Sequence, residues 1–254
     1  MKRKCVSVLV AALLIASISF AVYPSVSKTV VNHNNQTIAD QYVQQLNDVY
    51  EGSSDDYLTD NEGYLINEEG RRLSSLPILC QEDLDRLYQD SVQYNDKLKS
   101  YQHVDDFEYA PFDLKDYGIQ SGIYAIIDIP SIDLNLPIYL GANEYNMSFG
   151  ATHLFSTSLP IGGSGTNSVI CGHTGFLGKV FFDDLGKLSE GDEIIITNYF
   201  GTLRYKVISG TVIDSDNVDQ CYLEHDKDLI TLLTCAARGT KRYMVVAERK
   251  TDHE

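Results

Sequence analysis

Several features that would place this chain in a common protein class are missing from its sequence. It has no tryptophan, no Cys-x-x-Cys pair and no basic stripe, and its formal net charge is −16. Nucleic-acid binding needs clustered lysine and arginine, so this charge balance excludes that class. Five cysteines at irregular spacing do not indicate a disulfide scaffold or a zinc ribbon. Hydrophobic residues still make up 43% of the chain, enough for a packed core.

One long apolar run is present, at the N-terminus. Residues 1–4 are basic, and the run from Cys5 to Tyr23 carries no charge. A membrane-spanning helix needs about 20 such residues. We therefore expect residues 5–23 to be a transmembrane signal-anchor, with a cleaved signal peptide as the alternative. The basic flank predicts that residues 1–4 are cytoplasmic and that the rest of the chain lies outside the cytoplasm.

The pattern of apolar and polar residues changes near residue 110. Residues 24–109 read as a loose polar stalk over residues 27–41 and helices over 38–50 and 84–98, with an acidic insertion and a small hairpin between the helices. Residues 110–254 read as one all-β domain, because short β-rich runs alternate with turn residues and no long helix intervenes. The expected strands cover 123–129, 136–139, 168–171, 193–197, 203–213, 229–234 and 242–248.

Cys235 is the cysteine best placed for chemistry. It closes the run from Leu229 to Thr234, and a short turn containing Arg238 and Gly239 follows. A thiol at the end of a strand is held firmly yet stays accessible, and a nearby arginine favours the reactive thiolate. Cys171 ends an apolar strand, where a small buried hydrophobe is the default interpretation.

A cysteine nucleophile needs a histidine and a group that stabilises negative charge. His173 follows the apolar run ending at Cys171, and the glycines around it let the backbone turn. Arg242 opens the next strand after Cys235, so an antiparallel return would bring its guanidinium back to the thiol as an oxyanion donor. Arg238 is the rival, although a residue on a strand is better fixed.

These motifs resemble those of the sortase family. Thr231-Leu-Leu-Thr-Cys235 is similar to the TLxTC signature, and Ser168–Gly175 resembles the histidine segment of that family. His153–Gly163 and Ile126–Tyr139 are similar to the corresponding stretches of the pilus-building, class C sortases. Two features depart from that class. No second apolar run follows residue 23, and the lid motif is altered, with Asp106 and Phe107 in its place.

The resemblance implies a fold, a site and a reaction. We expect a closed eight-stranded β-barrel with short helices, catalytic residues His173, Cys235 and Arg242, and substrate contacts at Thr234 and His153. The thiolate would attack an LPxTG-like sorting signal, and an amine would resolve the thioacyl-enzyme. That amine would be a pilin lysine or, alternatively, a cell-wall precursor. The reaction calls for no metal or organic cofactor.

Two other functions compete with this reading. A papain-like cysteine hydrolase places its cysteine before its histidine and at the start of a helix, which is the reverse of the order here. An anchored β-barrel adhesion or assembly module would make Cys235 merely structural. Leu159–Gly163 superficially resembles a sorting signal, but no apolar span follows it, so we interpret it as a loop.

Overall fold

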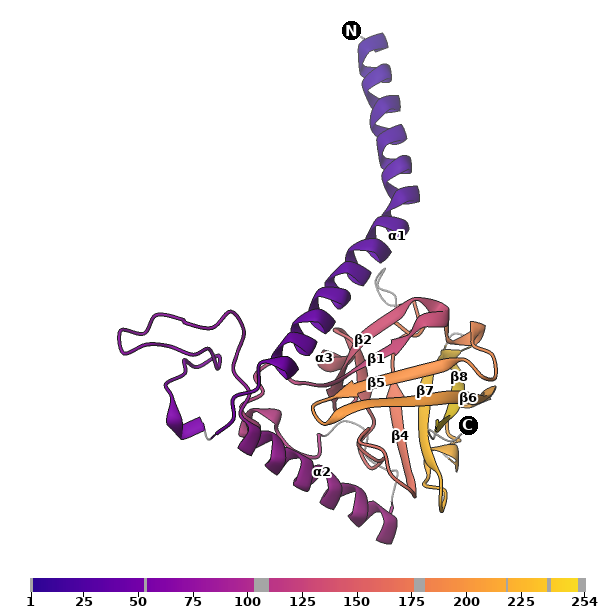
Figure 1. Ribbon diagram of the computed structural model, residues 1–254. Coiled ribbons are helices and arrows are strands. Elements are labelled where there is room, and N and C mark those ends of the chain that lie inside the picture. Colours follow the sequence, from indigo (N-terminus) through magenta and orange to yellow (C-terminus); the bar gives the residue numbers. More distant parts are fainter. Residues whose placement is uncertain are drawn as a thin grey trace.

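The structure is a computed structural model that describes residues 2–52, 54–102, 110–175, 181–217, 219–236 and 239–250. Two helices precede a β-barrel (Figure 1). They are α1 (Lys2–Asn47) and α2 (Gln81–Ser100). The strands are β1 (Ile123–Ile129), β2 (Leu134–Leu140), β3 (Ala151–His153), β4 (Thr166–Cys171), β5 (Glu193–Asn198), β6 (Gly201–Asp214), β7 (Asp228–Ala236) and β8 (Lys241–Arg249).

The eight strands close into a barrel in the order β1-β2-β3-β4-β7-β8-β6-β5, which confirms the predicted fold class. Two neighbouring pairs are parallel, β2 with β3 and β4 with β7, and the others are antiparallel. Strand alternation sorts the side chains. On β7, Ile230 and Leu232 belong to the main core, whereas Leu229 and Leu233 lie in or against smaller outer clusters. The barrel interior is therefore a packed apolar core.

Short helical turns connect the strands. The one-turn helix α3 (Glu144–Met147) follows β2, and the 3-10 turns are η1 (Ser54–Asp56), η2 (Leu114–Tyr117), η3 (Pro130–Ile132), η4 (Leu185–Lys187) and η5 (Asp219–Cys221). The connection between the parallel strands β4 and β7 contains η4, β5, β6 and η5. A parallel pair needs such a long crossover, because both strands must run in the same direction.

The segment expected to be a loose stalk is helical. Residues 27–41 lie within the 46-residue helix α1. Local composition does not account for this helix, but packing does. In its C-terminal part Ala39 and Tyr42 are buried against the barrel, and the Tyr42 hydroxyl donates to the Tyr124 carbonyl at 2.9 Å. Packing of an apolar face stabilises a helix more than intrinsic propensity does.

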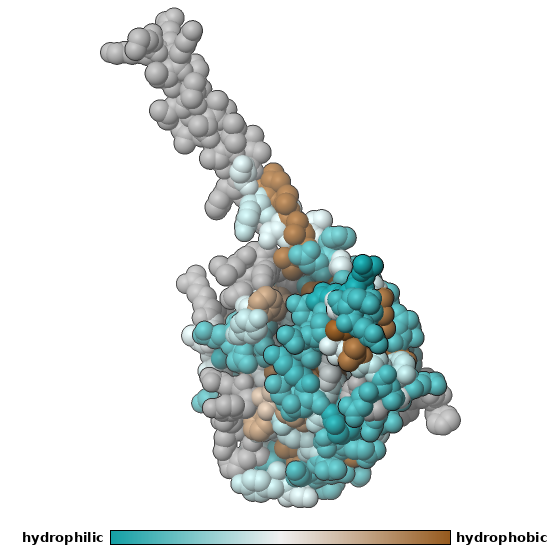
Figure 2. Space-filling view, turned by 90° about the vertical axis from the view of Figure 1, so that its left-hand side faces the viewer, coloured by the Kyte–Doolittle hydropathy of each residue, from teal (hydrophilic) through white to brown (hydrophobic). Residues whose placement is uncertain are grey.

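The N-terminal part of α1 extends beyond the barrel (Figure 1). Apolar side chains lie on its exposed surface between the barrel and the grey N-terminal end (Figure 2), and the exposed apolar residues of this part include Val22, Val26 and Val30, at helical spacing on one face. Within the part of the chain that the structure describes, we find no helix whose length and hydropathy together suffice for crossing a bilayer. The anchor at residues 5–23 stays a prediction.

The acidic insertion projects to one side of the molecule (Figure 1). Two isolated antiparallel bridges, Thr59 with Leu65 and Ile66 with Arg72, form a small meander. Arg72 stacks over Tyr64 at 3.8 Å and pairs with Asp60 at 2.6 Å, which holds the meander together. The expected small hairpin around residues 64–66 is therefore present.

Helix α2 packs beside the barrel through a buried amide. The Asn95 side chain accepts from the Leu159 N–H at 2.8 Å and donates to the Leu159 carbonyl at 3.2 Å. Leu159 itself is fully buried. The sequence Leu159–Gly163 is thus a fixed connecting loop between β3 and β4, as we interpreted it.

Candidate active site

Cys235 and Arg242 face each other across two adjacent strands. Cys235 lies next to the last residue of β7 and is exposed, and its register partner on β8 is Arg242. Directly opposite residues of an antiparallel pair lie on the same face with Cβ atoms about 5 Å apart. The chain thus returns to bring Arg242 directly opposite Cys235 on the neighbouring strand, as the sequence predicted. The Arg242 Nη1 donates to the carbonyls of Gly239 at 2.9 Å and Lys241 at 3.1 Å, so the turn holds the side chain.

The His173 segment continues the parallel pairing between β4 and β7. Cys171 is the register partner of Leu233, and the Gly172 N–H donates to the Leu233 carbonyl at 3.1 Å. His173 and Cys235 each follow two residues after that pair. The structure therefore brings His173, Cys235 and Arg242 to one end of β4, β7 and β8. We call this end of the three strands the rim.

Two glycines allow the chain to turn at His173. A Cβ atom on Gly172 would lie 2.8 Å from ring atoms of Phe182, so only glycine fits there. Gly175 has a φ of +70°, a conformation that glycine adopts without strain. Its N–H donates to the Asp183 carboxylate at 2.7 Å. Gly172 thus allows close packing against Phe182, and Gly175 allows a left-handed turn.

Burial and a carboxylate act on His173 in opposite directions. The imidazole is partly buried, and this desolvation lowers its pKa. The Glu144 carboxylate on α3 favours the charged form and offsets part of that shift. Met147 of α3 packs against the cluster that contains Cys171, so α3 lies beside the end of β4, a neighbour that no motif in the sequence indicated.

Thr234 has a different place from the one expected. It is buried, its hydroxyl donates to the Gly172 carbonyl at 2.7 Å, and it shares a 2.6 Å hydrogen bond with the Thr174 hydroxyl. Thr234, the residue directly before Cys235, is thus hydrogen-bonded to both neighbours of His173. This correction replaces the expected substrate contact with a positioning role, because the hydroxyl is already engaged inside the protein.

His153 is also a correction to the expected substrate contacts. It is fully buried on β3, and its Nε2 lies 3.1 Å from the Thr157 carbonyl and 3.0 Å from the Ser158 carbonyl. Burial lowers its pKa to about 4. The side chain offers no surface to a substrate and instead ties down the loop after β3.

Two further thiols lie beside the rim in an apolar cluster. Cys171 and Cys221 are buried together with Leu154 and Val169. Burial raises the pKa of Cys171 to about 12 and that of Cys221 to about 11. Both are therefore protonated at neutral pH and chemically quiet. Across the described residues, no group of three histidine, cysteine or acidic side chains is placed to hold a metal ion.

Other predicted residues lie outside the described part of the chain. They are Asp106 and Phe107 of the possible lid, and Arg238, the rival to Arg242. Their assignments stay predictions.

Two residues that sequence reasoning missed shape the surroundings of the rim. Asp183 accepts from the N–H groups of Gly175 at 2.7 Å and Phe181 at 3.0 Å. Gln102 donates to the Cys221 carbonyl at 3.3 Å and accepts from the Leu223 N–H at 2.8 Å, which ties the end of α2 to the loop before β7. Asp183 is near in sequence to His173, but nothing in the sequence pairs Gln102 with that loop.

This arrangement is suited to nucleophilic chemistry on a carbonyl. An exposed thiol, a partly buried imidazole and a guanidinium at one rim can supply a nucleophile, a proton carrier and an oxyanion donor. The fold and the rim together define the molecule as a closed β-barrel protein with a cysteine-centred site.

Comparison with known proteins agrees with this class. A family model described as the Sortase domain matches residues 127–250. Among solved structures, the pilus-related sortase C of Group B Streptococcus superposes with a TM-score of 0.60 at 32% identity, covering 68% of this chain and 91% of that one. Sortase C1 of Streptococcus agalactiae, in its complex with MTSET, gives a TM-score of 0.62 at 27% identity, covering 68% and 93%.

Curated relatives match over a shorter stretch. Sortase A of Listeria monocytogenes is 31% identical over 132 residues, which are 51% of this chain and 57% of that protein. Sortase D of Bacillus subtilis is 26% identical over 131 residues, which are 50% of this chain and 63% of that protein. The chain thus spans less than two thirds of these relatives. It belongs to the sortase family, whose members are cysteine transpeptidases, and the predicted resemblance to class C sortases is confirmed.

Proposed function

We propose that this chain is a sortase that cleaves an LPxTG-like sorting signal and joins the cleaved protein to an amine. The observation that carries the proposal is the register pair of Cys235 and Arg242, with the His173 segment tied beside it through Thr234. The position of Cys235, Arg242 and the His173 segment at one rim supports a site at which all three act on one peptide carbonyl.

The first half-reaction forms a thioacyl-enzyme. The Cys235 thiolate attacks the carbonyl carbon of the scissile peptide bond, and N–H groups of Arg242 stabilise the oxyanion. His173 gives its proton to the departing amine as the C–N bond breaks. Partial burial of His173 keeps its pKa below the ordinary value, and the Glu144 carboxylate limits that loss, so the imidazole can both give and take a proton.

The second half-reaction restores the thiolate. An acceptor amine attacks the thioester carbonyl, the C–S bond breaks, and His173 takes the proton that the amine loses. We propose a pilin lysine as the acceptor, which makes the reaction pilus polymerisation. Support comes from the likeness to a structure described as a pilus-related sortase C. Transfer to a cell-wall precursor is the competing outcome.

We also propose that residues 5–23 anchor the chain in a membrane with the barrel outside the cytoplasm. The uncharged run after a basic flank supports this. Expression of the full chain and of residues 29–254, followed by membrane fractionation, tests this. If both forms stay in the soluble fraction, the anchor is rejected.

The reaction itself is tested with the full chain, LPxTG-type peptides and candidate pilins. Mass spectrometry should find a thioacyl adduct on Cys235 and then an isopeptide bond to a pilin lysine. Products joined only to a peptidoglycan amine would support wall anchoring instead. Absence of any adduct on Cys235 with the full peptide panel would favour the non-enzymatic β-barrel module.

A further inference from the structure

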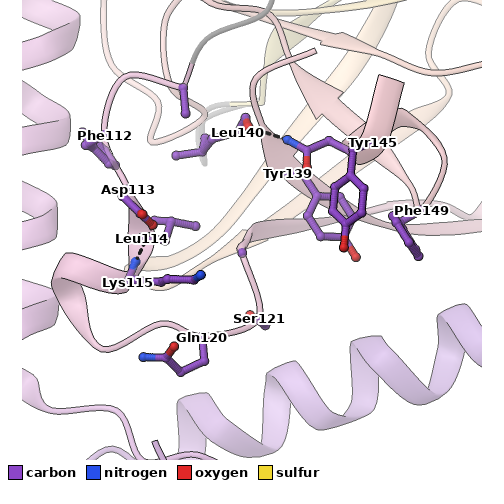
Figure 3. A pocket seen from close by; sticks show the side chains of 13 residues that line it. Phe112, Asp113, Leu114, Lys115, Gln120, Ser121, Tyr139, Leu140, Tyr145 and Phe149 are labelled. Carbon is purple, nitrogen blue, oxygen red and sulfur yellow. Dashed lines mark hydrogen bonds between the residues drawn. The ribbon is translucent and has the colours of Figure 1, made fainter. Parts of the chain in front are cut away.

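A cavity of about 630 Å³ opens on the outside of the barrel beside α3. Its apolar walls include Phe112, Leu114, Tyr139, Leu140, Tyr145 and Phe149. Figure 3 shows the aromatic side chains of Tyr139, Tyr145 and Phe149 on one side of the opening, with Phe112 and Leu114 across from them. The cavity lies apart from the thiol, and the chemistry derived above does not use it.

Two of the aromatic rings are unusually exposed for such large side chains. Tyr145 is 73% exposed and Phe149 is 46% exposed, and their ring centroids are 4.9 Å apart. Neither ring belongs to the barrel core. The two rings are tilted by 57° to each other and already in contact, so a ligand that binds there orders fewer side-chain rotamers than it would at two separate rings.

The one-turn helix α3 connects this cavity to the rim. Ala142 and Met147 pack against the cluster of Cys171, and the Glu144 carboxylate is near enough to favour protonation of His173. Tyr145 follows Glu144 directly and lines the cavity. A bound segment could therefore rest in the cavity and reach past Glu144 toward the imidazole.

The two sides of the cavity differ in polarity. Lys115 and Gln120 lie across from the rings of Tyr145 and Phe149 (Figure 3). The Asn146 amide is already engaged, because it donates to the carbonyls of Leu140 at 2.8 Å and Gly141 at 3.0 Å. The aromatic side of the cavity therefore suits an apolar side chain of a polypeptide.

The charge near the cavity indicates which charged group the bound polypeptide segment contains. Glu144 is exposed, directly precedes the lining residue Tyr145, and its charge acts on His173, and the chain as a whole is acidic with a net charge of −16. A carboxylate in this position attracts an ammonium group and not a carboxylate.

We propose that this cavity binds the acceptor in the second half-reaction, by taking an apolar side chain that lies a few residues from the acceptor lysine. Glu144 then guides the lysine ammonium to the rim. This inference rests on the proposed transpeptidase function and names the part of the molecule that recognises its second substrate.

The test uses the full chain and acetylated lysine peptides with amidated ends. One peptide places only glycines around the lysine, and the others place one leucine or phenylalanine one to six positions away. We expect the best apolar peptide to bind about tenfold more tightly than the glycine peptide in equilibrium titration, and to show a similarly lower KM in aminolysis of the thioacyl-enzyme. The Tyr145→Ser and Phe149→Ser variants should lose this advantage.

The matched control is Tyr88→Ser. Tyr88 is 41% exposed and its ring centroid lies 5.0 Å from that of Phe200, so it removes a similar ring pair on another face. This variant should keep the tenfold advantage. The inference is overturned if no apolar position improves binding, or if the advantage survives in Tyr145→Ser. It is also overturned if only a muropeptide amine depends on Tyr145.

Binding and chemistry can fail separately in this design. Peptide binding that depends on Tyr145, without any thioacyl adduct on Cys235, would support the cavity and reject the proposed function. Normal adduct formation with peptide binding that ignores Tyr145 would reject the cavity alone.

Discussion

Two neighbouring regions of this barrel contain the same reactive groups in opposite environments. The rim has an exposed thiol, Cys235, and a partly buried imidazole, His173. The wall below it has the buried thiol of Cys171, whose pKa rises to about 12, and the buried imidazole of His153, whose pKa falls to about 4. Residue type is thus a poor guide to reactivity here. Exposure decides it, because His153 and Cys171 also end their strands, β3 and β4, yet are buried there, whereas Cys235 is exposed near the end of β7.

The largest expected effect separates the two thiols. Cys235→Ala removes the nucleophile and should reduce peptide cleavage by at least roughly a thousandfold. Cys171→Ala removes a buried sulfur that takes no part in the reaction and should leave cleavage within about threefold. Initial rates with an LPxTG-type peptide measure both. Iodoacetamide should label Cys235 before Cys171 or Cys221, and the comparison fails if a buried thiol reacts first.

Arg242 should give the next largest effect. Arg242→Ala removes the proposed oxyanion donor, and loss of one such donor typically costs about 10²- to 10³-fold in kcat. Arg204→Ala is the matched control, because Arg204 pairs with Glu193 at 3.0 Å on the exposed surface of β6. Single-turnover rates of thioacyl formation measure the difference. Equal losses in the two variants would remove Arg242 from the mechanism.

Thr234 tests whether the His173 segment must be tied to β7. Thr234→Val keeps the shape but deprives the Gly172 carbonyl and Thr174 hydroxyl of their partner, which should cost about 1–3 kcal/mol of stability. We also expect kcat to fall by about tenfold, with little change in KM, because the imidazole is no longer held in place. Thr231→Val is the control, since Thr231 also lies on β7 and its buried hydroxyl donates to Asn167 on β4, away from His173. If both variants lose stability and neither loses kcat, Thr234 has only a structural role.

Glu144 should give the smallest effect, a shift in pH dependence. The carboxylate raises the pKa of His173, so Glu144→Gln should lower that pKa further. Thioacyl formation needs protonated His173, and its rate falls as pH rises through this pKa. The falling limb of the pH–rate profile should therefore move to lower pH in the variant. High salt should shrink the difference between the two profiles, and coincident profiles at low salt would contradict this reading.

Most of the barrel could be predicted from the sequence, because each long strand contains a β-rich run bounded by turn residues. Strand β3 escaped prediction, since three residues are too few to show a period. The helix over residues 27–41 escaped for another reason. Its polar composition resembles a stalk, yet it is continuous with the predicted helix over 38–50, where Ala39 and Tyr42 are buried.

The candidate site was also predictable only in part. A short turn predicts that Arg242 returns to Cys235, and the register confirms it. The placement of His173 depends on the parallel pairing of β4 with β7, which are far apart in the chain, so residue patterns alone could not derive it. The burial of individual side chains could not be predicted from the sequence either. His153 and Thr234 were assigned to substrate because nothing in the sequence showed that neighbouring carbonyls already engage them.

The length of α1 has a consequence for how the enzyme is oriented. A continuous helix of 46 residues follows a path of roughly 70 Å, with a bend along it (Figure 1), and Tyr42 near its C-terminal end is hydrogen-bonded to the barrel. A flexible tether would set only a maximum reach. In the proposed anchored enzyme, helix α1 also sets the angle at which the catalytic rim meets its substrates. Insertion of a few glycines near residue 30 should therefore change which lysines are reached without altering the rim.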